Sequence, residues 1–351
     1  MSMRMAALAW SLTLGQPALA APSLKVETVV EGLSAPWAFD FLPDGRILVT
    51  ERAGQLRVVV DGKLLEAPIS GVPEVHHAGQ GGLLDVLVDR DYAANQRLFL
   101  SFAHRDKGGN ATRVVSARLD GEALVEVREL FTASPRQRTA VHYGGRLLQL
   151  PDDQLMLSLG DGFDYREDAQ QPENHHGKIV VFPVTGGEPK VWSLGHRNVQ
   201  GLVRDPESGA IWAHEHGPRG GDEINRIERG ANYGWPVATF GVDYSGAVIS
   251  PYSSRPGMVD PLLVWTPSIA PSGMVLYSGA RFPEWRGDLF VSALAGRQLV
   301  RVRFTSGAPE QEVLLQDQRE RLRDVAEGPD GALWVLTDGG RAKLLRVIPG
   351  G

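Results

Sequence analysis

A polar turn followed by a short apolar segment recurs along the chain. Residues 43–46 form one such turn and lead into Ile47–Thr50, and residues 151–154 lead into Leu155–Leu159. Segments of this length and composition are typical of strands. We count six of them, and their first residues are Ile47, Leu98, Leu155, Ala210, Leu289 and Ala332. No long helical stripe with caps at both ends accompanies them, so the pattern predicts an all-β protein.

The spacing of these segments indicates how the strands are arranged. Their first residues lie 43 to 79 apart, close to the ~40–50 residues of a propeller repeat with insertions. Small antiparallel sheets bury both faces when they pack radially. We therefore predict a six-bladed β-propeller of four-stranded antiparallel blades, closed by pairing residues 24–30 with residues 343–348. A pair of β-sandwiches is the alternative, but sandwiches do not explain a repeated motif.

Composition excludes several classes of protein. With 42 % hydrophobic and 22 % charged residues, the chain is neither a disordered tail nor a coiled coil. It has no cysteine, which rules out a disulfide scaffold, a cysteine-ligated metal and a thiol nucleophile. A net charge of −6 gives no general attraction to nucleic acid or to anionic membranes. The 41 glycines agree with many tight turns.

The first 20 residues have the features of a secretory signal peptide. Arg4 gives a positive start, residues 5–14 are apolar, and Ala18-Leu19-Ala20 is a small-residue cleavage pattern. No later segment approaches the ~18 apolar residues of a membrane span. We expect a signal peptide at 1–20, a single propeller domain at 21–351, and a periplasmic or secreted protein.

Two loops carry candidate groups for chemistry near a flat ligand. Gln80 stands among glycines in Gly79–Val86, where a ligand can approach the backbone closely; an ordinary flexible turn is the alternative. His142 is followed one predicted strand later by Asp161, and an imidazole oriented by a carboxylate is the usual general base near neutral pH. A structural histidine is the alternative.

Arginines in two further loops point to an anionic ligand. Arg197 and Asn198 share a loop, and a planar guanidinium suits a carboxylate, a phosphate or a developing oxyanion. Arg321 and Arg323 alternate in an extended segment, which places both on one side of it and suggests a polycarboxylate. Salt-bridged surface loops and a solvated charged edge are the alternatives.

The glycine-rich segment His214–Asn225 is the strongest candidate for a metal site. It contains Asp222, Glu223 and bare backbone carbonyls, which are the hard oxygen ligands that calcium prefers. The His214-x-His216 pair offers zinc or copper as the alternative.

In their joint order, these residues resemble the soluble PQQ-dependent aldose sugar dehydrogenases, also called glucose/sorbosone dehydrogenase-like proteins. The resemblance extends over roughly residues 26–348. The segments that carry it are Leu33–Trp37, Gly79–Leu84, His142–Arg146, Gly195–Asn198, Gly217–Asn225, Asn232–Pro236, Pro267–Gly273 and Arg321–Val325.

The resemblance implies a role for each matching position. His142 is implied as the general base, with Asp161 as its orienting partner, and Arg197 stabilises charge on the reacting oxygens. Contacts to pyrroloquinoline quinone (PQQ) are implied for Gln80, Arg197, Asn198, Tyr244, Ala293, Leu294, Arg321 and Arg323. One departure is that Ala295 stands where the family often has a lysine, and Arg297 is a possible substitute.

Two calcium sites are also implied by the resemblance. The carbonyls of Gly217 and Pro218 would approach calcium bound to the cofactor, while Glu223 and Tyr233, with Asp222 assisting, would hold a structural calcium.

The implied reaction is oxidation of an aldose sugar at its anomeric carbon. The product is a lactone, a hydride passes to PQQ, and the electrons go on to an acceptor that the sequence does not identify. We expect a monomer or homodimer. A calcium-dependent propeller lactonase and a non-catalytic propeller that binds a partner are the alternatives.

Overall fold

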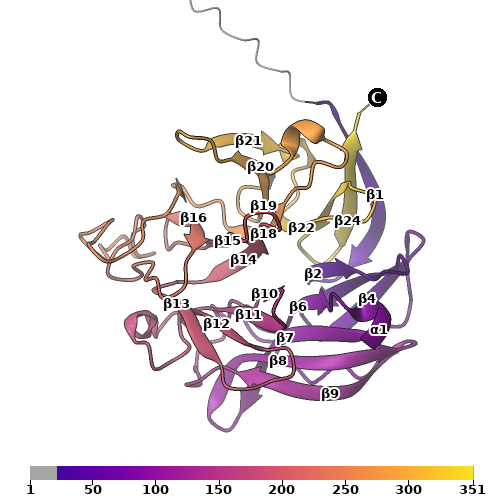
Figure 1. The fold of residues 1–351 in the computed structure, drawn as a ribbon, viewed down its shortest axis with the longest axis horizontal. Coiled ribbons are helices and arrows are strands. Elements are labelled where there is room, and N and C mark those ends of the chain that lie inside the picture. Colours follow the sequence, from indigo (N-terminus) through magenta and orange to yellow (C-terminus); the bar gives the residue numbers. More distant parts are fainter. Residues whose placement is uncertain (1–21, 351) are drawn as a thin grey trace, which may run out of the picture.

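The computed structural model describes residues 22–350. Six sheets of four antiparallel strands surround a central axis (Figure 1). The prediction of a six-bladed β-propeller is therefore confirmed, and the β-sandwich alternative is wrong. The predicted signal peptide at residues 1–20 lies outside the described residues.

The blades follow one another along the chain, each with its first strand nearest the axis. The first blade has strands β2 Pro36–Phe41, β3 Ile47–Glu51, β4 Gln55–Val60 and β5 Lys63–Leu64, and the second has β6 Leu83–Val88, β7 Arg97–Asp106, β8 Gly109–Asp120 and β9 Ala123–Thr132. The third has β10 Leu147–Gln149, β11 Gln154–Leu159, β12 Lys178–Pro183 and β13 Lys190–Leu194, and the fourth has β14 Val199–Arg204, β15 Ile211–Glu215, β16 Asp222–Ile227 and β17 Leu263–Trp265. The fifth has β18 Pro271–Leu276, β19 Leu289–Ala293, β20 Gln298–Arg303 and β21 Glu310–Leu314, and the sixth has β22 Leu322–Glu327, β23 Leu333–Thr337, β24 Ala342–Pro349 and β1 Leu24–Leu33.

Helices are short and lie in the connections. They are α1 Tyr92–Asn95 and the 3-10 turns η1 Arg166–Gln170, η2 Pro283–Trp285 and η3 Gln316–Gln318. Within residues 22–350, no helix has both the length and the apolar character needed to cross a membrane.

The ring closes through its terminal strands. β1 pairs antiparallel with β24, from Leu24 opposite Pro349 to Leu33 opposite Ala342; in Figure 1 the indigo β1 lies beside the yellow β24. This is the closure predicted from the sequence. It joins the start of the described chain to its end and leaves no gap in the ring.

The repeated sequence unit has one structural meaning. Each of the six turn-and-segment motifs forms the second strand of a blade, namely β3, β7, β11, β15, β19 and β23. These strands lie between two others and between two neighbouring blades, so both of their faces are buried. Leu155 and Leu157 pack toward the second blade, while Met156 packs toward the fourth. Burial on both faces explains why these segments are apolar throughout.

The hydrophobic core is divided into wedges between adjacent blades. One wedge joins Leu48 and Leu56 of the first blade to Leu98 and Leu100 of the second, and corresponding wedges fill the other five junctions. The first strands of successive blades also contact one another around the axis. Each blade is therefore stabilised by its two neighbours.

Strand direction places the candidate chemistry at one end of the propeller. In an antiparallel blade, the connection from second to third strand and the connection to the next blade leave from the same end. Asp161 lies in the first kind of connection, and Gln80, His142 and Arg197 lie in the second kind. The long excursion between β16 and β17 returns to this end, where Val242 forms a bridge with Arg219.

Candidate active site

Two neighbouring cavities open at this end of the propeller. The main cavity has a volume of about 290 Å³ and is lined by Pro36, Trp37, Arg52, Gly79, Gln80, Leu84, Tyr143, Gly144, Asn198, Gln200, His216, Leu294, Arg321, Arg323 and Asp338. The side cavity, of about 250 Å³, is lined by Asp161, Phe163, Asp164, Arg166, Arg197, Pro218, Trp235, Asp243, Tyr244 and Ile249. Together they have the size of a site for a small ligand.

His142 is held between residues of both cavities. Its backbone N–H donates to Gln80 Oε1 of the main cavity at 2.9 Å, and its ring Nδ1 lies 2.6 Å from Asp161 Oδ1 of the side cavity. The residue has φ of 54°, in the left-handed region. For a non-glycine residue this conformation costs on the order of 1 kcal/mol and persists only where the surroundings impose it. The two hydrogen bonds are such surroundings.

The electrostatics leave His142 ready to accept a proton. Burial lowers the pKa of His142, although the hydrogen bond with Asp161 and its charge oppose the shift. Burial alone would raise the pKa of Asp161, but the hydrogen bond to His142 and the charges of His142 and Arg197 lower it overall. A carboxylate at Nδ1 fixes the proton on that nitrogen. Within residues 22–350, no protein group hydrogen-bonds Nε2, which is left as the basic atom.

Arg197 shapes the wall beside this pair. Its guanidinium donates to the carbonyl of His216 at 3.1 Å and to that of Gly217 at 2.7 Å. It lies over the rings of Trp235 and Tyr244, at 5.4 and 5.8 Å from their centroids. Tyr244 is 58 % exposed and belongs to the side cavity, so the structure does not bring it to the wall of the main cavity.

Three guanidiniums line the main cavity, together with the carboxylate of Asp338. Arg321 and Arg323 were expected from the sequence. Arg321 pairs with Asp338 at 2.9 Å, while Arg323 donates only to neutral oxygens, those of Trp37 and Gln200, both at 3.3 Å. Arg52 is the third, and among residues 22–350 its side chain hydrogen-bonds only the carbonyl of Gly79, at 2.8 Å.

Other expected cofactor contacts divide between the cavity wall and the core. Gln80, Asn198 and Leu294 line the main cavity. Asn198 Oδ1 accepts from the backbone N–H of Gly144 at 3.1 Å, which ties two loops together. Ala293 is fully buried at the end of β19 and is not part of this wall.

Sequence reasoning missed several residues of the main cavity. Trp37 was noted only within a motif and His216 only in the zinc or copper alternative, while Arg52 and Asp338 were not noted at all. Arg52 and Asp338 follow second strands, β3 and β23. The repeat itself was the available signal, because every second strand ends at the site end of the propeller.

The carboxylates expected at metal sites have different surroundings. Asp222 accepts four hydrogen bonds, from the Gly217 N–H at 2.9 Å and from Ser268 Oγ and the Ile269 and Ala270 N–H groups at 2.6 to 2.9 Å. It therefore holds two loops together. The hydroxyl of Tyr233 is likewise engaged, donating to the Arg226 carbonyl at 2.6 Å.

Glu223 is less well compensated: Asn225 Nδ2 donates to it at 3.1 Å. It stands directly opposite Glu215 in the pairing of β15 with β16, and like charges at such positions are destabilising. Burial and the charge of Glu215 raise the pKa of Glu223 well above its usual value. Both side chains line a space of about 10 Å³, together with Tyr233 and the backbone of Gly195 and Gly217. That volume holds one small particle, and the hard oxygen donors suit calcium.

No larger metal cluster is present in the described part of the chain: no three His, Asp or Glu side chains gather around one point. His214 is buried with neither ring nitrogen hydrogen-bonded, and His216 Nε2 lies 2.7 Å from the Pro271 carbonyl. This arrangement does not favour a zinc or copper site at these two histidines.

Comparison with known proteins identifies the family. A family model described as glucose/sorbosone dehydrogenase matches residues 33–346. The chain belongs to the glucose/sorbosone dehydrogenase family. It is 40 % identical to an aldose sugar dehydrogenase of Escherichia coli, with 94 % of each chain covered. Membership of this family makes it an oxidoreductase.

Solved structures of glucose/sorbosone dehydrogenase relatives agree with the fold. The soluble aldose sugar dehydrogenase of Escherichia coli in its apo-form is 39 % identical, with a TM-score of 0.89 over 93 % of this chain and 100 % of that one. The PQQ-bound form of aldose sugar dehydrogenase from Streptomyces coelicolor is 30 % identical, with a TM-score of 0.77 over 94 % and 99 %.

Proposed function

We propose that this chain is a PQQ-dependent aldose dehydrogenase that oxidises the anomeric carbon of a sugar to a lactone. The observation that carries the proposal is the position of His142. A neutral imidazole oriented by Asp161 stands between a cavity rich in guanidinium groups and a second cavity open to solvent. The relatives of this family, one of them with PQQ bound, support the same function.

The residues of the main cavity fit the cofactor. PQQ is planar and carries three carboxylates, which match Arg321, Arg323 and Arg52 in charge. Gln80 and Asn198 offer amides from two further blades, and Leu294 offers an apolar contact. When bound, PQQ supplies the two-electron oxidant that takes hydrogen with its electron pair from the sugar, and an external acceptor receives the electrons.

His142 supplies the proton transfer. Nε2 takes the proton of the anomeric hydroxyl while C1 loses its hydrogen, so the sugar becomes the lactone by the net loss of two hydrogens. Asp161 holds the productive tautomer and stabilises the imidazolium that forms. A base positioned in this way contributes about 10²–10⁴-fold to the rate. Arg197 stabilises negative charge on the reacting oxygens from the adjacent wall.

Calcium fits two places in this scheme. The Glu215–Glu223 pair and nearby carbonyls would hold a structural ion that relieves the repulsion between the two carboxylates. The carbonyls of Gly217 and Pro218, on the loop that Arg197 fixes, would approach an ion bound to the cofactor. At that second place calcium would supply a Lewis acid for the quinone carbonyl.

The cellular location follows from the first 20 residues, whose pattern supports export. We infer that the signal peptide is removed, that residues 21–351 form one propeller domain, and that the enzyme acts in the periplasm or outside the cell. It works there as a monomer or homodimer.

Reconstitution tests the proposal. Purified, chelator-treated protein is mixed with PQQ, with calcium, or with both, and dye reduction by glucose and other aldoses is followed while the sugar product is analysed. We expect aldose-dependent reduction and a lactone only with PQQ and calcium together. Dye reduction that does not need PQQ, or a sugar product other than the lactone, contradicts the proposal.

A further inference from the structure

One buried arginine connects all six blades at the axis of the propeller. Arg146 precedes β10 of the third blade, and its side chain is 11 % exposed. Its Nε donates to the Gln200 carbonyl at 3.0 Å, and Nη2 lies 3.4 Å from the Ser272 carbonyl. Its guanidinium also lies over the ring of Trp37, 4.5 Å from the centroid. These partners belong to the first strands of three other blades.

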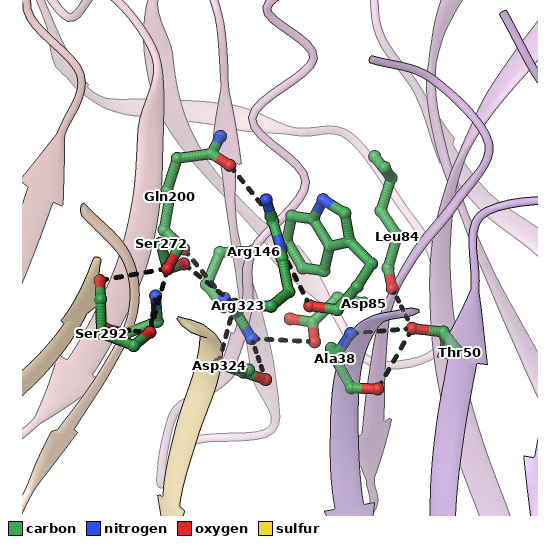
Figure 2. A network of polar contacts seen from close by, with 12 residues as sticks. Ala38, Thr50, Leu84, Asp85, Arg146, Gln200, Ser272, Ser292, Arg323 and Asp324 are labelled. Carbon is green, nitrogen blue, oxygen red and sulfur yellow. Dashed lines mark hydrogen bonds and ion pairs between the residues drawn. The ribbon is translucent and has the colours of Figure 1, made fainter. Parts of the chain in front are cut away.

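Carboxylates of the two remaining blades complete the cluster. Arg146 Nη1 lies 3.2 Å from Asp85 Oδ1, while Nη2 and Nη1 lie 3.1 and 3.4 Å from the two oxygens of Asp324. Figure 2 shows Arg146 between these two carboxylates, with Arg323 close by. Although burial opposes it, the negative charges of Asp324 and Asp85 raise the pKa of Arg146. Arg146 is therefore charged, and the two carboxylates share its single positive charge.

Arg323 adjoins this cluster but makes no ion pair in it. Its guanidinium lies 4.7 Å from the same Trp37 ring, and its chain neighbour Asp324 points both oxygens at Arg146. Within residues 22–350, no carboxylate lies within ion-pair distance of Arg323. Burial and the nearby positive charge of Arg146 lower the pKa of Arg323 to about 10. A buried guanidinium without a counter-charge is costly unless an anion binds it.

We propose that Arg146 is a positioning residue that keeps Arg323 available to the anionic ligand of the main cavity by holding Asp324 away from it. Arg323 lines that cavity and Arg146 does not. Without Arg146, the buried carboxylate of Asp324 would lose its partner, and the neighbouring Arg323 would become its counter-ion. The identity of the ligand as PQQ rests on the proposed function; the competition for the Asp324 carboxylate does not.

A set of four proteins tests this competition: wild type, Arg146→Met, Asp324→Asn and Arg146→Met/Asp324→Asn. The dissociation constant for PQQ is measured by titration well below each melting temperature. We expect Arg146→Met to bind about 10-fold or more weakly, and the double variant to recover to within about 3-fold of wild type, because a neutral amide in place of the Asp324 carboxylate cannot capture Arg323. A merely structural role of Arg146 predicts no such recovery.

The matched control is Arg301→Lys. Arg301 is also partly buried: it pairs with Asp288 at 2.8 Å and with Glu312, and it lies 5.6 Å from the centroid of Trp285. It stands on β20, away from the main cavity, so its loss should lower the melting temperature and leave the dissociation constant unchanged. If Arg146→Met does not fold, Arg146→Lys takes its place, because its single ammonium cannot hold both carboxylates.

A crystal structure of the cofactor-free Arg146 variant separates this proposal from the proposed function. We expect the Arg323 guanidinium within about 4 Å of the Asp324 carboxylate, the range of an ion pair. An Arg323 that keeps its contacts with Trp37 and Gln200, or a double variant as weak as Arg146→Met, overturns the proposal. Wild-type protein that binds no PQQ contradicts the proposed function instead, and the position of Arg323 then decides this proposal alone.

Discussion

The carboxylate of Asp161 is shared between His142 and Trp235. Oδ1 lies 2.6 Å from His142 Nδ1, and Oδ2 accepts the indole N–H of Trp235 at 2.8 Å. The backbone N–H of Phe163 donates to Oδ1 as well, at 2.8 Å. Both oxygens are thus fixed from separate parts of the chain, and the imidazole has one orientation available. This rigidity suits a base that must meet the substrate in one geometry.

Replacing Asp161 by asparagine tests whether the carboxylate tunes the imidazole. Because its charge and hydrogen bond raise the pKa of His142, the change should move the acid limb of kcat/KM to lower pH. It should also lower kcat by about 10²–10⁴-fold, since the amide no longer fixes the tautomer. A pH–rate profile measured at saturating PQQ gives both quantities. An acid limb that stays in place while kcat falls contradicts the assigned pairing.

Arg52 is predicted to bind the anionic cofactor. Arg52→Gln should raise the dissociation constant for PQQ by about 10-fold, because charge-assisted contacts of this kind are worth about 1.5–3 kcal/mol, and should reduce its salt dependence. Arg286→Gln makes the same change in net charge in the turn before β19, and the exposed pair of Arg286 with Glu207 makes it a suitable control. Equal dissociation constants for Arg52→Gln and the control would remove Arg52 from the site.

Glu223→Gln should reverse its effect on stability when calcium is present. In chelated protein the variant should be as stable as wild type or more stable, because the repulsion with Glu215 is removed. In excess calcium, the melting temperature of wild type should rise, and that of the variant should change little. Thermal unfolding in chelator and in calcium measures both. If the melting temperature of wild type is the same with and without calcium, no structural ion is bound at this pair.

Asp40 should make stability depend on pH. Burial raises the pKa of Asp40 to about 7, against the hydrogen bonds from Val88 and Phe41. The unfolded chain has an aspartate pKa of ~3.9, so the contribution of Asp40 is complete below that pH and is lost as pH rises through 7. Between pH 5 and pH 8, wild type should lose about 1–3 kcal/mol more unfolding free energy than Asp40→Asn. Urea unfolding at both pH values measures the difference; equal losses would contradict the shifted pKa.

The fold was predictable because the second strand of every blade is a short apolar segment that recurs along the sequence. Second strands such as Leu155–Leu159 are buried on both faces, so their apolar runs are continuous and easy to recognise. Edge strands such as β5 and β21 have partly exposed residues and weaker patterns, and the sequence did not reveal them. The pairing of β1 with β24 was predictable because the first and last strands of the chain must meet if the blades form a closed ring.

The candidate site was predictable only where a motif is local. His142 and Asp161 are 19 residues apart in one blade, and their contact was expected. Arg52 lies far along the chain from Arg321 and Arg323, and only the ring brings the three guanidiniums to one cavity. Three of the four donors to Asp222 come from the connection between β17 and β18, more than 40 residues along the chain, so the sequence pattern did not reveal its structural role.

The most direct test of the account is the rate at which an aldose reduces PQQ bound to wild type and to His142→Asn, followed by stopped-flow absorbance in the presence of calcium. The account predicts similar dissociation constants for PQQ and a rate about 10²–10⁴-fold lower in the variant, with the wild-type rate falling at acidic pH as His142 is protonated. Equal rates in the two proteins would contradict the role of His142 as the base that starts the oxidation.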